Sequence, residues 1–179
     1  MELPVNIVAL GSGVSMAFLG NSHFGLEDLA VMRAIPNINI SSPADCGELG
    51  KILNDYCHNS RGPSYIRLTG VPGSPLVYEN DYNYKFGIPH EINKGKNILI
   101  LATGSIVGQT KIALERLNEF GINPSLYNVH TLKNKCEYTL NLIKQYKFII
   151  TIEEHSIIGG LASIISEAIA QNNCKAKLF

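Results

Sequence analysis

His23 is the residue whose type and position most clearly suggest chemistry. It lies in GNSHFGLEDLAVMRAIPN, residues 20–37, where a polar loop meets an acidic, amphipathic segment that ends at a proline. An imidazole exchanges protons near neutral pH, and the junction of a loop with a helix is both firmly held and reachable. Histidines at such junctions are also commonly structural, and the loop shows no nucleophile and base at a recognisable spacing. His23 and the adjacent Ser22 are therefore candidates that need support from the rest of the chain.

A second set of candidates follows two expected strands. His130 comes after the apolar run 125–129, and the polar residues 153–155 come after the run 148–152. Open parallel α/β sheets bind ligands at the carboxyl edge of their strands, which is where these side chains would lie. Polar residues also occur in such loops for purely structural reasons. We therefore place His130 and His155 at the edge of a possible site, and we expect no metal ligands.

Two other patterns favour a structural interpretation. ATGSIVGQ, residues 102–109, follows a strand and opens a helix, so its backbone amides could hold an anion. It lacks the GxGxxG spacing of a dinucleotide site, and tight turns of this composition are routine. The four cysteines show neither CxxC nor the Cys/His spacing of a zinc site. We expect all four to be reduced: Cys46, Cys57, Cys136 and Cys174.

Composition excludes several classes of protein. A chain of 179 residues can bury a core without a disulfide or metal, and 45% hydrophobic with 17% charged residues is typical of a globular protein. The formal net charge of zero offers no basic surface for nucleic acid. No apolar run approaches the roughly 18 residues of a membrane span, and the N-terminus lacks a signal peptide pattern. We expect a cytoplasmic protein that binds neither nucleic acid nor membranes.

The elements that must position these residues alternate between strands and helices. Short, β-branched runs predict strands at residues 5–10, 37–40, 63–68, 98–103, 125–129, 148–152 and, at the end, 177–179. Amphipathic patterns predict helices at residues 25–34, 43–57, 106–119, 136–146 and 160–171. Strands this apolar are typical of sheets covered on both faces, and the alternation predicts layered α/β units with mainly parallel sheets.

The ends of two helices carry recognisable signals. In the helix expected at 43–57, Ser42 is the expected N-cap, Pro43 the first helical residue and Asp45 the acid of a capping box. Gly121 is expected to close the helix 106–119 as a C-terminal cap.

The regular alternation is interrupted in the middle of the chain. Residues 73–96 are rich in prolines and turn formers and have no helical period, so they predict a linker with a possible hairpin. Residues 1–72 then form a first α/β unit, which has too few elements to be a complete doubly wound sheet. Residues 97–179 form the second unit.

At this level of detail, the sequence resembles a known family. GNSHFGLEDLAVMRAIPNINISSPADCGELGKIL and GPSYIRL resemble the pyrimidine-binding domain of transketolases, in which a Thr-His or Ser-His loop precedes ED, IPN and PAD motifs. ILILATGSIVGQTKIALERLNEFGI, VHTLK and ITIEEHSIIGGLASIISEAI resemble successive elements of the family's C-terminal domain. The sequences of these segments are most similar to those of the C-terminal subunit of split transketolases. By this resemblance, residues 1–72 are the end of a pyrimidine-binding domain and residues 97–179 a truncated transketolase C-terminal domain.

The resemblance implies a thiamine diphosphate enzyme that transfers a two-carbon ketol unit between sugars. His23 matches the loop histidine that, in the family, faces the thiazolium and the substrate and helps in proton transfer. Thiamine diphosphate and Mg²⁺ would be bound mainly by segments absent from this chain. The implied partners are an N-terminal transketolase subunit, or a missing N-terminal half, together with a second copy in a homodimer and sugar substrates.

Departures from the family pattern limit what the chain is expected to do alone. The family's glutamate on the aminopyrimidine would lie upstream of Met1, and the Gly-Asp-Gly and Asn motif of the diphosphate site is missing. Both ends look truncated, so we expect the isolated chain to be inactive and assign it no cofactor-binding residue. Gly70 stands where the family carries an arginine that grips the sugar phosphate, which leaves phosphosugar specificity open.

Other functions remain as alternatives. Within the same cofactor class, these are a deoxyxylulose phosphate synthase or a 2-oxo acid dehydrogenase β-subunit fragment; the Ser-His loop and VHTLK favour transketolase over both. From a different class comes a non-catalytic dimerisation or interaction module, which the missing glutamate favours.

Overall fold

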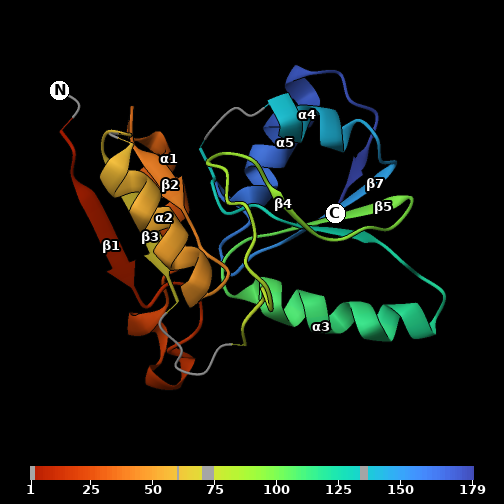
Figure 1. The fold of residues 1–179 in the computed structure, drawn as a ribbon, viewed down its shortest axis with the longest axis horizontal. Coiled ribbons are helices and arrows are strands. Elements are labelled where there is room, and N and C mark those ends of the chain that lie inside the picture. Colours follow the sequence, from red (N-terminus) through yellow and green to blue (C-terminus); the bar gives the residue numbers. More distant parts are fainter. Residues whose placement is uncertain (1–2, 60, 70–74, 134–136) are drawn as a thin grey trace.

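The computed structural model describes residues 3–59, 61–69, 75–133 and 137–179. Two α/β units lie side by side, the first holding β1 to β3 with α1 and α2, and the second holding all later elements (Figure 1). In the part of the chain that is described, no helix has the length and hydropathy needed to cross a membrane.

The first unit is a three-stranded parallel sheet in the order β1-β3-β2. Its elements, in chain order, are β1 (Asn6–Leu10), α1 (Asp28–Ala34), β2 (Asn39–Ser41), α2 (Cys46–His58) and β3 (Ser64–Leu68). Two short 3-10 turns, Ala17–Leu19 and Asn21–His23, lie between β1 and α1. The central strand β3 alternates between two buried environments: Ile66 packs against α2, and Tyr65 belongs to the cluster that includes α1. A strand covered on both faces is the environment that its apolar run predicts.

The first strand differs from that expectation. β1 pairs only with β3, and three of its apolar side chains, Ile7, Val8 and Leu10, are 46%, 51% and 69% exposed. Its sequence is that of a buried strand, yet it forms the edge of this sheet.

The second unit is a five-stranded sheet in the order β4-β6-β5-β7-β8. Its strands are β4 (His90–Asn93), β5 (Ile98–Ala102), β6 (Ser125–Asn128), β7 (Phe148–Ile152) and β8 (Lys177–Leu178). All pairings are parallel except that of β4 with β6. The helix α3 (Ile106–Glu119) covers one face, and α4 (Glu137–Ile143) and α5 (Leu161–Gln171) cover the other (Figure 1). The expected α/β class with mainly parallel sheets is confirmed.

Other local expectations are wrong, among them the start of the helix expected at 25–34, which is Asp28. The described part of the segment 73–96 contains no hairpin; instead His90–Asn93 pairs antiparallel with β6 and extends the second sheet. The helix α2 begins three residues later than expected. Asp45, not Ser42, is its N-cap and accepts a hydrogen bond from the Glu48 amide at 2.9 Å. A capping box is present, but Glu48 supplies the acid and reaches back to the Ala44 amide at 2.7 Å.

The expected end of α3 agrees with the structure. Gly121 follows the C-cap Phe120 and has a φ of +72°, the left-handed conformation that favours glycine.

Candidate active site

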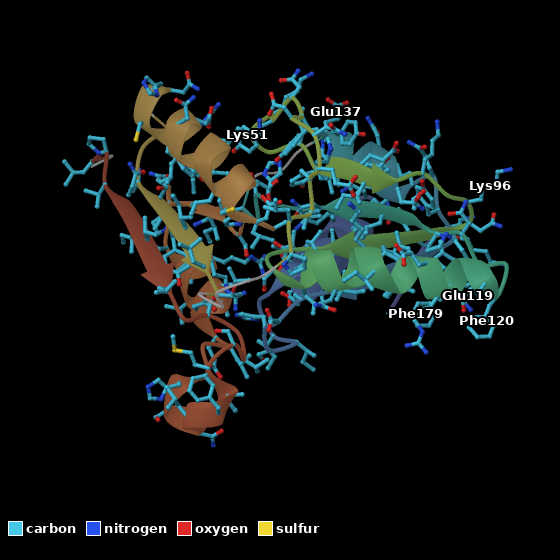
Figure 2. All side chains as sticks on the ribbon, turned by 60° about the horizontal axis from the view of Figure 1, so that its bottom comes forward. Lys51, Lys96, Glu119, Phe120, Glu137 and Phe179 are labelled. Carbon is cyan, nitrogen blue, oxygen red and sulfur yellow. The ribbon has the colours of Figure 1, made fainter. Side chains whose placement is uncertain are left out.

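His23 lies in an exposed loop, in the second of two 3-10 turns. The loop between β1 and α1, with its two 3-10 turns, projects from one end of the first unit (Figures 1 and 2). The His23 ring is exposed, and its Nδ1 lies 3.0 Å from the Ser22 hydroxyl. Among the described residues, this is the ring's one hydrogen-bond contact. The opposite nitrogen has no hydrogen-bond partner among the described residues and belongs to an exposed side chain, which a substrate oxygen could reach.

Large apolar side chains surround His23 on the same loop. Phe18 is 84% exposed, and Val14, Leu19 and Phe24 are also exposed. Several large apolar groups on one short loop are unusual for a free surface and typical of a ligand or protein contact.

The base of this loop is fixed by two glycines. The amide of Gly13 donates to the Gly25 carbonyl at 2.8 Å, and the amide of Gly25 donates to the Gly13 carbonyl at 3.0 Å. A Cβ on Gly25 would approach the Ser12 Cα to 3.1 Å, so a larger residue here would push the two segments apart by a few tenths of an ångström. The loop is thus held at its base by this pair of hydrogen bonds.

Glu153 has a structural role. Its carboxylate accepts hydrogen bonds from the backbone amides of Leu161 and Ala162, at 2.7 and 2.9 Å, and so caps the N-terminus of α5. Gly160 makes room for it, because a Cβ at this position would lie 2.2 Å from Glu153 Oε2. An acid at a helix N-terminus satisfies free amides and complements the helix dipole.

Glu154 joins the two units. Its carboxylate accepts a hydrogen bond from the Ser105 hydroxyl at 2.9 Å, at the start of α3. The turn that could have held an external anion thus meets a carboxylate of the same chain. On its other side Glu154 packs against the loop of the first unit, where a Cβ on Gly13 would come within 2.9 Å of Glu154 Cβ.

His155 lies at the carboxyl edge of the sheet, as expected, but it faces the first unit. Its side chain is fully buried, and its Nε2 lies 3.9 Å from Asp28 Oδ1 at the start of α1. Its Nδ1 lies 2.8 Å from the Ser156 carbonyl. The structure therefore brings His155 close to the helix that follows His23, without exposing it to a ligand.

His130 belongs to a different buried cluster. It is 1% exposed, its Nδ1 lies 2.9 Å from the Thr131 hydroxyl, and its ring stacks on Tyr84. Burial lowers the pKa of His130, although the Glu48 carboxylate acts in the opposite direction. Burial therefore favours the neutral form of this ring, and its contacts are those of a structural histidine.

Sequence reasoning missed Glu48, a fully buried carboxylate between the two units. It accepts hydrogen bonds from the Asn128 amide of β6, at 2.8 and 2.9 Å, and from the hydroxyls of Tyr78 and Tyr82. Burial and this carboxylate raise the pKa of both tyrosines. The one sequence signal is its position three residues after Asp45, which marks a capping box but no contact across 80 residues.

Metal ligands and cysteines can be assessed only in the described residues. There, no three or more His, Cys, Asp or Glu side chains gather in a way that could hold a metal ion. Cys46, Cys57 and Cys174 are free thiols. Cys136 and Gly70 lie outside the described residues, so the expectations for them stay predictions.

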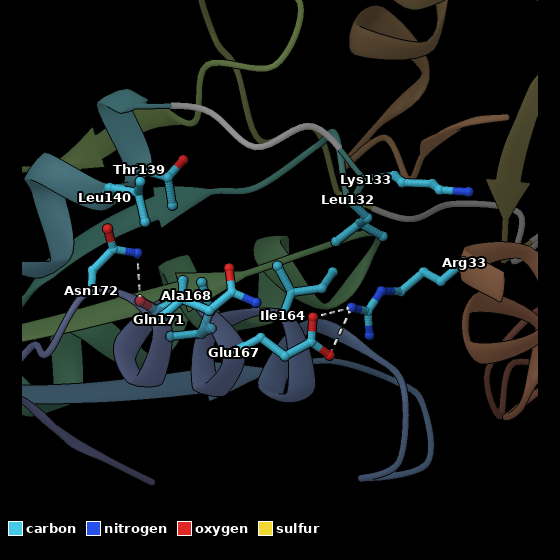
Figure 3. A pocket seen from close by; sticks show the side chains of 11 residues that line it. Arg33, Leu132, Lys133, Thr139, Leu140, Ile164, Glu167, Ala168, Gln171 and Asn172 are labelled. Atoms are coloured by element: carbon cyan, nitrogen blue, oxygen red, sulfur yellow. Dashed lines mark hydrogen bonds and ion pairs between the residues drawn. The ribbon is translucent and has the colours of Figure 1, made fainter. Parts of the chain in front are cut away.

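A pocket of about 280 Å³ lies apart from the His23 loop, between α4, α5 and the end of α1 (Figure 3). Arg33 reaches across it and binds both carboxylate oxygens of Glu167, at 2.9 and 2.8 Å, and the Gly159 carbonyl at 2.8 Å. Burial and the neighbouring Arg33 lower the pKa of Lys133 on its rim. Arg33 is already paired, and its bonds join the two units. We therefore regard this pocket as part of the junction between the units and not as part of the His23 site.

Comparison with known proteins identifies the family. The model of the transketolase pyrimidine-binding domain matches residues 1–70, and that of the transketolase C-terminal domain matches residues 90–178. The chain belongs to the transketolase family. Within it, the match is to C-terminal subunits of split transketolases. One subunit of an apulose-4-phosphate transketolase from Actinobacillus succinogenes is 35% identical over 97% of this chain. A transketolase C-terminal section from Methanocaldococcus jannaschii is 36% identical over 99%.

A solved structure agrees with these relatives. A split-gene transketolase described as an inactive β4 tetramer has a TM-score of 0.80 and 31% identity, covering 93% of this chain and 54% of that one. Deoxyxylulose phosphate synthases match as well, for example that of Dictyoglomus thermophilum at 36% identity, but this chain covers only 27% of its length. The chain spans about half the length of the curated split-transketolase relatives, 56% in both cases.

Proposed function

We propose that this chain is the C-terminal portion of a transketolase-type enzyme that transfers a two-carbon ketol unit from a ketose to an aldose. The observation that carries the proposal is the exposed His23 imidazole beside Ser22, in a loop with a fixed base. The family's loop histidine occupies the same place in its motif. The named relatives act on different sugars, so the proposal is confined to ketol transfer.

His23 would move protons and hold substrate oxygens. With Nδ1 directed at Ser22, the outward nitrogen can donate to a substrate oxygen that gains negative charge, or accept a proton from a hydroxyl. An imidazole suits both tasks because it changes protonation state near neutral pH.

The proposed cofactor is thiamine diphosphate with Mg²⁺. When bound, it supplies the carbon nucleophile that carries the two-carbon unit. Mg²⁺ prefers oxygen ligands in an octahedral array, and we assign these ligands and the diphosphate contacts to the partner polypeptide. The residues present fit one wall of such a site, with the exposed apolar side chains of the His23 loop available to pack against the cofactor ring or the partner.

The proposed partners are an N-terminal transketolase subunit and a second copy of this chain, in the cytoplasm. The names of two relatives, one a transketolase subunit and the other a C-terminal section, support a division of the enzyme between polypeptides. The chain alone is then inactive. A non-catalytic interaction module would place no demand on His23, whereas ketol transfer does.

The test is His23→Ala in the assembled enzyme with its N-terminal partner. Loss of an acid-base group should lower turnover of ketose substrates by about 10²-fold or more while thiamine diphosphate affinity changes little. His58→Ala is the matched control, because His58 is also exposed and lies at the end of α2. Steady-state kinetics that show wild-type turnover for His23→Ala would refute the assignment.

A further inference from the structure

Arg67 is a buried cation that sits between the His23 loop and the second unit. It lies on β3 and is only 2% exposed. Its Nε binds both carboxylate oxygens of Asp28, at 3.1 and 2.8 Å. Its Nη2 donates to the Gly25 carbonyl at 3.1 Å and to the Glu154 carbonyl at 2.8 Å. One guanidinium thus joins the base of the loop, the start of α1 and the end of β7.

These contacts place Arg67 at the base of the loop that carries His23. Gly25 is two residues beyond His23 and is the same residue whose amide pairs with Gly13. Its carbonyl is held on one side by the Gly13 amide and on the other by Arg67. Only Phe24 lies between Gly25 and His23 in the chain, so a shift at this carbonyl reaches the imidazole through a single residue.

The second unit contributes through its backbone. Arg67 Nη2 donates to the Glu154 carbonyl as well as to the Gly25 carbonyl. In addition, the Ser156 amide donates to the Leu26 carbonyl at 2.8 Å. His155 lies beside Asp28, the carboxylate that neutralises Arg67. Burying a guanidinium is costly unless it is paired and its donors are satisfied, and here the partners come from both units.

We propose that Arg67 is the positioning residue for His23, and that the C-terminal domain takes part in ketol transfer by holding this loop through Arg67. The proposal rests on the proposed function. A misplacement of about 1 Å at a reacting group can lower a rate by about 10²-fold, so a clamp on the loop base has a direct effect on turnover.

Arg67→Lys keeps the charge next to Asp28 but replaces a planar fork by a single ammonium, which cannot span the same set of partners. In the assembled enzyme it should lower kcat/KM by about 10-fold or more. In the chain itself it should speed hydrogen exchange of the Gly25 amide by about 10-fold or more, because the loop base opens more often. Asp28→Asn, which weakens the hold on Arg67 without touching Gly25, should shift both quantities in the same direction.

Arg33→Lys is the matched control. Arg33 also runs from the first unit to a carboxylate and a backbone carbonyl of the second, but it lies on the last turn of α1, away from the loop base. It should leave kcat/KM and Gly25 exchange within about twofold of wild type, because contacts that are not shared with the loop are independent of it.

A double-mutant cycle with His23→Ala separates this proposal from the proposed function. If Arg67 acts through His23, Arg67→Lys should change turnover by less than about twofold once His23 is alanine. An equal loss with and without His23, or unchanged exchange at Gly25 in Arg67→Lys, would overturn the positioning role. Wild-type turnover of His23→Ala would instead overturn the proposed function, and Gly25 exchange would still decide whether Arg67 fixes the loop.

Discussion

At the scale of single residues, sequence reasoning located side chains better than it explained them. Polar residues after β7 were expected at the carboxyl edge of the sheet, and they lie there. Their tasks differ: Glu153 caps α5, Glu154 binds Ser105 and His155 is buried beside Asp28. None of these partners is adjacent in sequence, so no local pattern could have assigned them.

His23 was found by a different route. The spacing of His23 to other residues indicates no catalytic role. His23 stands out only because the surrounding sequence resembles that of a known family. Arg67 and Glu48 were missed because their partners are distant in the chain: the Arg67 bond to Glu154 spans 87 residues and the Glu48 bond to Asn128 spans 80. A buried charge is a property of the folded chain and leaves no periodic signal.

His130 gives a prediction about pH. Burial lowers the pKa of His130 from the ordinary 6.5. Below about pH 6.5, this histidine therefore binds a proton in the unfolded chain more readily than in the folded chain. The free energy of unfolding should therefore fall as pH decreases from 6.5 toward the folded-state pKa. Urea unfolding at about pH 7.5 and pH 5.5 measures this difference, which should be smaller in His130→Gln than in wild type.

The control for this prediction is His58→Gln, a change of the same type at an exposed position on the last turn of α2. It should keep the wild-type difference between the two pH values. If His130→Gln also keeps it in full, His130 is not the group responsible.

At the scale of elements, hydrophobic periodicity was sufficient for most strands and helices. The strands expected at 63–68, 98–103, 125–129 and 148–152 correspond to β3, β5, β6 and β7. Each of them ends within one residue of its expected end. Errors occurred where tertiary contacts decide. The Asp45 carboxylate accepts hydrogen bonds from the Val77 amide and from the Glu48 amide. These bonds hold Asp45 as the N-cap, so α2 begins at Cys46. The strand β4 is short and polar, and only its pairing with β6 makes it a strand.

The junction between α1 and the turn before α5 gives a prediction of its own. Gly159 has a φ of +83°, and a Cβ there would lie 2.4 Å from Ala30 Cβ and 2.8 Å from Ala30 Cα. Gly159→Ala therefore combines left-handed strain of roughly 1–2 kcal/mol with overpacking of about 1–3 kcal/mol between the two units. Thermal unfolding of the full chain should show a clear loss of stability.

Gly62→Ala isolates the packing contribution. Gly62 has a similar φ of +77°, but nothing lies within 4 Å of the place where its Cβ would be. It should show only the left-handed strain. Equal losses for the two variants would mean that close packing of the units at Gly159 contributes nothing measurable.

At the scale of the whole molecule, the proposed function makes this chain one wall of a site that a partner completes. We predict that the purified chain neither binds thiamine diphosphate tightly nor transfers ketol units, because the proposed ligands of Mg²⁺ and the diphosphate come from a partner. Calorimetric titration with thiamine diphosphate and magnesium checks this directly. Micromolar or tighter binding, or ketol transfer without a second polypeptide, would contradict it; the same titration after addition of the N-terminal partner is the positive control.

The open edge of β1 has a consequence for how the chain must be produced. A strand with unpaired backbone groups and exposed Ile7, Val8 and Leu10 can recruit strands of other molecules, and chains with such edges are prone to aggregate. In a cell, copies in which this edge stays uncovered would be left to chaperones and proteases. Such copies should therefore be degraded rather than stored, and their level should stay low.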